Sequence, residues 1–233
     1  PETEVNQFLE LYFSDPMAPM LDLPSEISFT EKHIEKPLVR LSFSRSKNVS
    51  LLHATLSFTY DENLVPFGKD SPVLYNIQKR EKINRNFEFE AEAYRKFLAL
   101  YPNIDGDFSG KMVLNTIEKA SLLGWEVFAH EKKTLVGKSF DLKITSDIDW
   151  FDLQVDFKFE GLKISLPQLL KNVKSGQRLI LFENGVYGVL PEAWMTRFKA
   201  LSDILPTGDG KVRLNKVQAL YLSATVNADD NFK

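Results

Sequence analysis

The stretch that decides the fold runs from Phe140 to Leu201 and reads FDLKITSDIDWFDLQVDFKFEGLKISLPQLLKNVKSGQRLILFENGVYGVLPEAWMTRFKAL. Its first twenty residues alternate apolar and polar side chains, the period of two that is typical of half-buried strands. We therefore expect two strands separated by a turn near residues 147–149. Their inward side chains should be Phe140, Leu142, Ile144 and Ile148, followed by Phe151, Leu153, Val155, Phe157 and Phe159. The same alternation places Trp150 on the polar side.

The rest of the stretch predicts helices around a short hairpin. Gly161 should turn the chain into a helix that Ser165 caps and Gly176 ends. Asn184-Gly185 is typical of a type I′ turn and predicts a hairpin with strands at 178–182 and 186–190. Pro191 should open a second helix. The residues that we expect these helices to bury are Leu166, Leu169, Leu170 and Val173, then Trp194, Phe198 and Leu201. A final helix should carry Leu214, Val217, Leu220, Tyr221 and Ala224.

Toward the N-terminus, apolar residues occur at helical spacing in some segments and alternate with polar residues in others. Helical spacing predicts helices over 4–13, 87–101 and 109–123, and alternation predicts an antiparallel hairpin over 38–60. Shorter strands are expected near 64–67, 73–77 and 125–129. The third helix should bury Val113, Ile117 and Ala120, and the second should carry one face of Phe87, Ala91, Tyr94, Leu98 and Tyr101.

These elements predict an α+β fold of mostly antiparallel sheets with packed helices. Pro102 and Gly106 interrupt two helices, which indicates two subdomains. We expect an N-terminal subdomain over residues 1–105, a second subdomain over 106–226, and the start of a linker over 227–233.

Composition narrows the function classes. The chain has 233 residues, no cysteine and a net charge of −3, so thiolate chemistry is excluded and wrapping of a nucleic-acid backbone is disfavoured. Residues 1–10 lack a signal-peptide pattern and apolar runs are too short to span a membrane, which favours a cytoplasmic protein. The chain begins without methionine and ends on a polar tail, so we expect it to be part of a longer polypeptide.

No motif for catalysis, metal binding or cofactor binding is complete. The sequence GDFSGK at 106–111 is one residue short of a phosphate loop and is followed by methionine where a hydroxyl is needed, so a turn before a helix is favoured and no ATPase activity is expected. The isolated His33, His53 and His130 do not fit a zinc site. Four aspartates at 147, 149, 152 and 156 favour a solvated strand face over a calcium site. No GxSxG turn presents a nucleophile.

Two features could contact partners. The basic run, which we define as Lys79, Arg80, Lys82 and Arg85, lies near aromatic residues and could bind phosphates, although four nearby glutamates favour a solvated face. Trp150 could anchor a protein partner, unless a helix of the same chain covers it.

The order of several segments resembles the accessory domain that precedes the motor in bacterial Swi/Snf-type (Snf-two family) helicases. The segments are PLVRLSF at 37–43, LLHATLSFTY at 51–60, GWEVF at 124–128, DWFDLQVDFKFEGLKISLPQLL at 149–170 and LPEAW at 190–194. The resemblance covers residues 37–224. It implies a non-catalytic accessory or regulatory region N-terminal to two ATPase lobes, which would be its partners in the same polypeptide. ATP and magnesium would belong to the parent DNA-dependent translocase, and the resemblance transfers no catalytic residue.

Two alternatives remain open from the sequence. A free-standing protein–protein interaction adaptor without a motor would use the same surfaces. A hydrolase with a site assembled from aspartates and serines is less favoured, because the sequence does not pair such residues.

Overall fold

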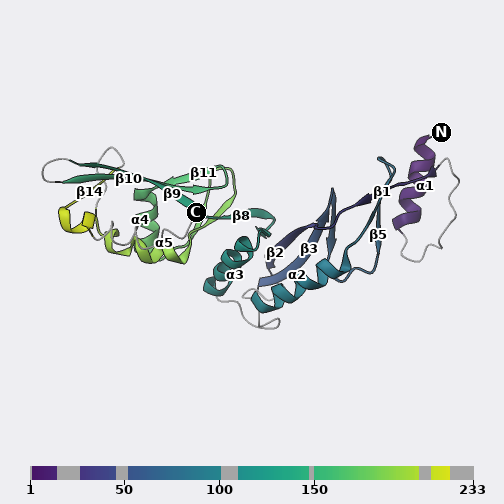
Figure 1. Ribbon diagram of the computed structural model, residues 1–233, viewed down its shortest axis with the longest axis horizontal. Helices are drawn as coiled ribbons and strands as arrows, with labels where there is room; N and C mark the ends of the chain where they lie inside the picture. Colours follow the sequence, from purple (N-terminus) through teal and green to yellow (C-terminus); the bar gives the residue numbers. More distant parts are fainter. Residues whose placement is uncertain are drawn as a thin grey trace. The chain divides into compact units, whose positions relative to one another are not determined.

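The computed structural model describes residues 2–14, 27–45, 52–100, 110–146, 150–204 and 211–220. They combine helices with mainly antiparallel sheets (Figure 1), which confirms the predicted α+β class. One compact unit contains residues 1–107 and 124–126, and the other contains 108–123 and 127–233. The predicted division after residue 105 and the predicted linker at 227–233 lie outside the described residues and stay predictions. None of the described helices is both long and apolar enough to cross a membrane.

The first unit is built on the predicted hairpin. β2 (Leu38–Arg45) and β3 (Leu52–Tyr60) pair antiparallel, and β4 (Asn63–Pro66) adds to β3. Alternate side chains of these strands form the core: Val39, Leu41, Phe43, Leu56, Phe58, Tyr60 and Val65.

α2 (Phe87–Leu100) occupies the predicted helix and packs on β3, but the face that it buries is not the apolar face noted in the sequence. The helix buries Glu90, Ala93 and Phe97, whereas the side chain of Phe87 is 46% exposed. The helix can turn a glutamate inward because Arg85 neutralises that carboxylate at 2.7 Å, which a pattern of apolar residues cannot reveal.

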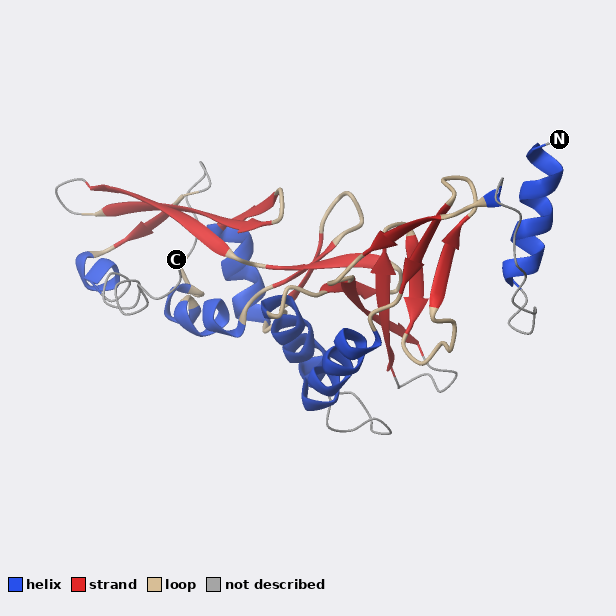
Figure 2. Cartoon of the chain, turned by 45° about the vertical axis from the view of Figure 1, so that its right-hand side comes forward, coloured by secondary structure: helices blue, strands red, loops and turns tan. Residues whose placement is uncertain are grey.

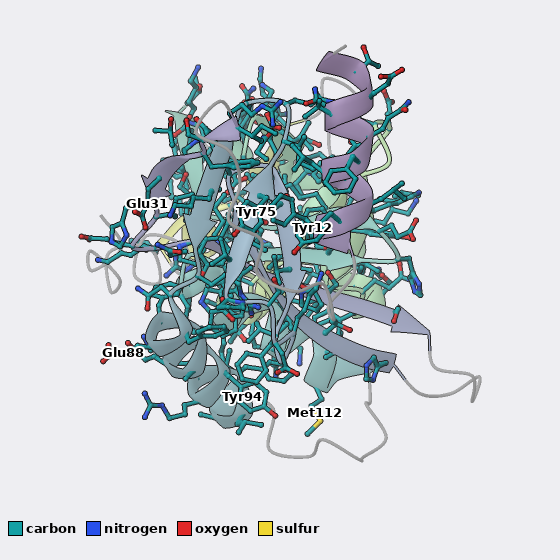
Figure 3. All side chains as sticks on the ribbon, turned by 90° about the vertical axis from the view of Figure 1, so that its right-hand side faces the viewer. Tyr12, Glu31, Tyr75, Glu88, Tyr94 and Met112 are labelled. Atoms are coloured by element: carbon teal, nitrogen blue, oxygen red, sulfur yellow. The ribbon has the colours of Figure 1, made fainter. Side chains whose placement is uncertain are left out.

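A second sheet of this unit has the order β1-β6-β5, from β1 (Thr30–His33), β6 (Glu81–Asn84) and β5 (Val73–Asn76). β5 confirms the strand expected near 73–77, whereas β1 and β6 had no sequence signal. α1 (Glu2–Ser14) contacts this sheet through Phe13, whose ring stacks on that of Tyr75 with 3.9 Å between the ring centres. Within the helix, Tyr12 packs edge-on against Phe13. Figure 3 shows Tyr12 on the helix and Tyr75 on the adjacent strand.

The second unit contains the sheet predicted from the opening stretch. β10 (Phe151–Phe159) is central; β9 (Ser139–Ser146) pairs along one side, and β11 (Leu162–Ser165) and β14 (Val212–Leu214) share the other. Leu153, Val155, Phe157 and Phe159 are buried, as predicted.

Two predictions for this part of the chain need correction, and three predicted residues lie outside the described residues. Ile144 was predicted to face inward, but its side chain is 50% exposed. In the described part of the chain β9 is an edge strand that pairs only with β10, so its side chains have a neighbouring strand on one side only. Leu214, predicted in a helix, ends β14 instead, since pairing with β10 satisfies its backbone; residues 216–220 are helical. Ile148, Tyr221 and Ala224 lie outside the described residues.

Helices cover one face of this sheet (Figures 1 and 2). α4 (Leu166–Ser175) packs on β10 and β11, and α5 (Glu192–Arg197) continues into the short 3-10 helix η2 (Lys199–Leu201). The predicted side chains of both helices enter the core, with Val173 partly buried. Ser165 occupies the predicted N-cap position of α4 in an extended conformation, but its side chain makes no capping hydrogen bond. Pro167 supplies a rigid first turn. Gly176 ends α4 with a φ of 68°, as expected.

A third group of strands in this unit follows the order β12-β13-β8-β7. The strands are β12 (Leu179–Leu181), β13 (Tyr187–Val189), β8 (Lys132–Val136) and β7 (Glu126–Ala129). β12 and β13 form the predicted hairpin, but its turn is not type I′. Gly185 has a φ of 79° while Asn184 does not have a positive φ, and the Gly185 N–H donates to Phe182 O at 2.9 Å. This geometry is a type I turn followed by a left-handed glycine, the usual three-residue alternative.

α3 (Gly110–Leu122) contacts β8 and β13 and buries Val113, Ile117 and Ala120, as predicted. Just after β8, a Cβ atom on Gly137 would overlap the indole ring of Trp194. Only a hydrogen atom fits between the Gly137 backbone and the ring, so the indole of Trp194 packs directly against the backbone at this position.

Candidate partner-binding surface

The outer face of the β10 sheet is polar. Side chains that alternate with the buried ones point away from α4 and α5, and the described helices of this unit lie on the other side (Figure 2). On β10 the outward residues are Asp152, Gln154, Asp156 and Lys158. This face of the β10 sheet is therefore polar, and α4 and α5 leave it uncovered.

Each aspartate on this face is paired with a cation from a neighbouring strand. Asp141 lies 2.6 Å from Lys158 Nζ, and Asp156 lies 3.0 Å from Lys163 Nζ. The carboxylates are thus held apart by lysines and do not converge on a common point, and no metal-binding group of acidic residues or histidines occurs among the described residues. The pairing makes the face polar but nearly charge-balanced.

Trp150 precedes β10 and is half-buried. The guanidinium of Arg213, from β14, lies 4.5 Å from the centre of the indole ring. Arg213 also pairs side by side with Asp152, with Nε–Oδ1 and Nη2–Oδ2 distances of 2.9 and 3.3 Å. We call these three residues the Trp150 cluster. The cation–π contact and the two-point ion pair fix the ring and the guanidinium together on the outer face.

Sequence reasoning selected Trp150 but missed Arg213. The missed signal is short: Val212 and Leu214 flank Arg213 with strand alternation, but three residues are too few to separate a strand from the start of a helix.

Lysines of the basic run are paired with acidic residues. Lys79 Nζ lies 2.8 Å from Glu62 and 3.8 Å from Asp61, and the Glu62 hydrogen bond raises the Lys79 pKa above its ordinary value. Lys82 Nζ lies 4.0 Å from Glu31. A phosphate would have to compete with these carboxylates, which weakens any nucleic-acid contact at this surface.

Arg80 points toward α1. Its Nη2 donates to Asn6 Oδ1 at 2.9 Å, and its guanidinium lies 5.9 Å from the ring centre of Phe29. The Nη1 atom is buried without a hydrogen-bond partner among the described residues. The Arg80 side chain therefore links the turn before β6 to the helix and the aromatic rings of the first unit.

Arg85 belongs to the core, so its assignment as a phosphate contact is wrong. Its Nε and Nη2 atoms donate to the Glu90 carboxylate at 3.0 and 2.7 Å, and Nη1 donates to the carbonyls of Ser71 and Lys69. Tyr60 adds a hydrogen bond to Glu90 at 2.9 Å, and burial raises the pKa of Tyr60 above its ordinary value, with the neighbouring Glu90 acting in the same direction. Because the guanidinium is enclosed, its charge serves folding and does not reach solvent.

Histidines do not converge either. His33 lies on β1, His53 on β3 and His130 in the turn between β7 and β8, and all three are exposed. In the motif at 106–111, α3 begins at Gly110, while residues 106–109 lie outside the described part of the chain.

We compared the chain with family models, with curated proteins and with solved structures, and none of the three comparisons found a match. The resemblance to the helicase accessory domain therefore stays a prediction.

Proposed function

We propose that this chain is a non-catalytic accessory region of a bacterial, cytoplasmic Swi/Snf-type DNA translocase, and that it regulates the motor by docking on its ATPase lobes. One observation carries the proposal beyond the sequence resemblance: the Trp150 cluster holds an outward aromatic ring on a sheet face that α4 and α5 leave open. Tryptophan and arginine are the residue types that most often dominate protein–protein binding energy.

The chemistry of the outer face supports a protein partner more than DNA. Its aspartates are paired with lysines and arginine, so it offers few unpaired cations to phosphates. DNA contact would then be weak or indirect. ATP and magnesium would be bound by the lobes of the parent protein.

The arrangement of the cluster also lowers the cost of docking. Arg213 already holds the indole ring in place, so little side-chain freedom is lost when a partner covers it. In a single polypeptide the lobes meet this face at roughly millimolar effective concentration, so a weak surface is sufficient.

The test uses the full-length protein that carries the motor. Trp150→Ala should change DNA-stimulated ATP turnover without lowering the melting temperature of the accessory region, because the ring packs outside the core. Gln154→Ala, on the same face of β10, is the matched control and should leave turnover unchanged. If Trp150→Ala and Gln154→Ala give the same turnover as the unmodified protein, docking through this face is refuted.

Deleting residues 1–226 separates this function from that of a free-standing adaptor. An accessory region predicts altered turnover by a motor that remains folded. Unchanged turnover would favour the adaptor, for which the same exposed ring would bind a separate protein.

A further inference from the structure

A cavity of about 470 Å³ lies in the second unit between α3, α4 and α5. Its lining residues are Leu114, Val173, Gly176, Arg178, Glu192, Met195, Thr196 and Lys199. This volume falls within the range of sites that bind small ligands or side chains of a partner. The cavity lies on the helical side of the β10 sheet and is separate from the Trp150 cluster.

One face of α5 and η2 supplies half of the lining. Glu192, Met195, Thr196 and Lys199 are spaced i, i+3, i+4 and i+7, so they share one side of the helix. The opposite side carries Trp194, Phe198 and Leu201 into the core. The buried side chains of Trp194, Phe198 and Leu201 hold this helix in place, and the helix in turn sets the spacing of the four residues that line the cavity.

The end of the cavity near Glu192 carries a net negative charge. Arg178 is buried and donates to the carboxylates of Glu192, at 2.9 Å, and Glu118. It also donates to Asn115 Oδ1 at 2.7 Å and Leu190 O at 2.8 Å. One guanidinium therefore faces two carboxylates, which leaves one negative charge uncompensated. The second oxygen of Glu192 accepts no hydrogen bond from the described residues and remains available to a ligand.

The other end carries a positive charge. Lys199 is exposed and makes no ion pair with the residues that the structure describes. Lys199 is seven positions after Glu192 along α5 and η2, so the backbone rises about 10 Å between the two residues. The apolar side chains of Met195, Leu114 and Val173 and the hydroxyl of Thr196 also line the cavity.

We propose that this cavity binds a short extended segment of another polypeptide that carries a basic residue and an acidic residue with an apolar residue between them. The basic side chain would pair with Glu192, the apolar one would fill the space beside Met195, and the acidic one would pair with Lys199. An extended chain advances about 3.3 Å per residue, so the two charged residues would be three positions apart. The complementary charges at both ends favour a peptide over a simple anion or cation, each of which one end would repel.

Binding can be measured with the intact chain and the labelled hexapeptide Ala-Arg-Leu-Ala-Glu-Ala by fluorescence polarisation. We expect saturable binding in the range of about 0.1 mM, and about tenfold weaker binding of Ala-Gln-Leu-Ala-Gln-Ala, which carries neither charge. The methyl resonance of Met195 should shift on titration, which locates the peptide in the cavity.

A charge reversal provides the decisive variant. Lys199→Glu should weaken the first peptide about tenfold and should recover binding to Ala-Arg-Leu-Ala-Lys-Ala. Lys171→Glu makes the same charge change on an exposed position of α4 that does not line the cavity, and it should leave the preference unchanged. Equal affinity for the charged and the uncharged peptide, identical behaviour of the two variants, or an unmoved Met195 resonance would each overturn the proposal. Trp150→Ala should not affect peptide binding, so this test stands or falls separately from that of the proposed function.

Discussion

Removing one partner of the Arg85–Glu90 pair should strongly destabilise the first unit. Replacing Arg85 with methionine keeps the aliphatic stem but leaves the Glu90 carboxylate, which is 1% exposed, with the Tyr60 hydroxyl as its one side-chain donor among the described residues. The carbonyls of Ser71 and Lys69 also lose their donor. Breaking a buried ion pair in this way costs about 3–5 kcal/mol. Because a small unit has only about 5–15 kcal/mol of stability in total, the loss would be a large part of it.

The matched variants separate the charge from the packing. Glu90→Gln keeps the shape of the side chain but leaves the buried guanidinium uncompensated, so it should cost a similar amount. Arg85→Met combined with Glu90→Met removes both charges and should cost much less than the sum of the single changes, since apolar replacement of a buried pair is often close to neutral. Lys96→Gln removes an exposed i, i+4 pair on the same helix and should have no measurable effect.

The assay is urea unfolding of the intact chain followed by circular dichroism, with hydrogen exchange to assign the loss to β2, β3 and α2. Hydrogen exchange is needed because two units need not unfold together. Costs below about 1 kcal/mol for Arg85→Met and Glu90→Gln, or a double variant equal to the sum of both, would refute the reasoning.

Three further outcomes follow from the structure. Phe157→Ala, which removes a ring packed against three aromatic neighbours, should cost about 3–5 kcal/mol in urea unfolding, against little for the outward Asp156→Ala; equal costs would contradict the assigned faces. Because the pKa of Tyr60 is raised, the folded chain keeps this phenol protonated while the unfolded chain ionises it near pH 10. The free energy of unfolding should therefore fall as the pH rises above about 10, and it should fall less steeply in Tyr60→Phe. Identical pH profiles of the two proteins would contradict this. DNA binding by the chain should be weak, fall with salt, and fall further when the three members of the basic run other than Arg85 are neutralised; tight, salt-insensitive binding would show that another surface is used.

The elements that could be predicted from the sequence are those whose burial follows one periodic pattern. β10 alternates over nine residues, and its inward side chains could be assigned because each one packs against the same helical layer. The buried side of α3 could likewise be predicted, because Val113, Ile117 and Ala120 follow helical spacing. In such elements the local pattern and the tertiary contacts agree.

The rest depends on contacts between distant residues. β1 and β6 contain lysine and glutamate and pair with each other across about fifty residues, so no local pattern marks them. Glu90 is buried only because Arg85 and Tyr60 surround its carboxylate. On the candidate surface, the aromatic character of Trp150 was visible in the sequence, but its stacking with Arg213 depends on the pairing of β14 with β10.

The close approach of Gly137 and Trp194 has an evolutionary consequence. A chain that keeps this core can acquire a side chain at position 137 only if the residue at 194 becomes smaller, so changes at the two positions should be coupled. Neither residue is exceptional alone, and they are more than fifty positions apart in the sequence. Relatives whose overall sequences have diverged could therefore be recognised by a glycine before a strand with the pattern of β10 and a tryptophan after it. The two residues should occur together or be lost together.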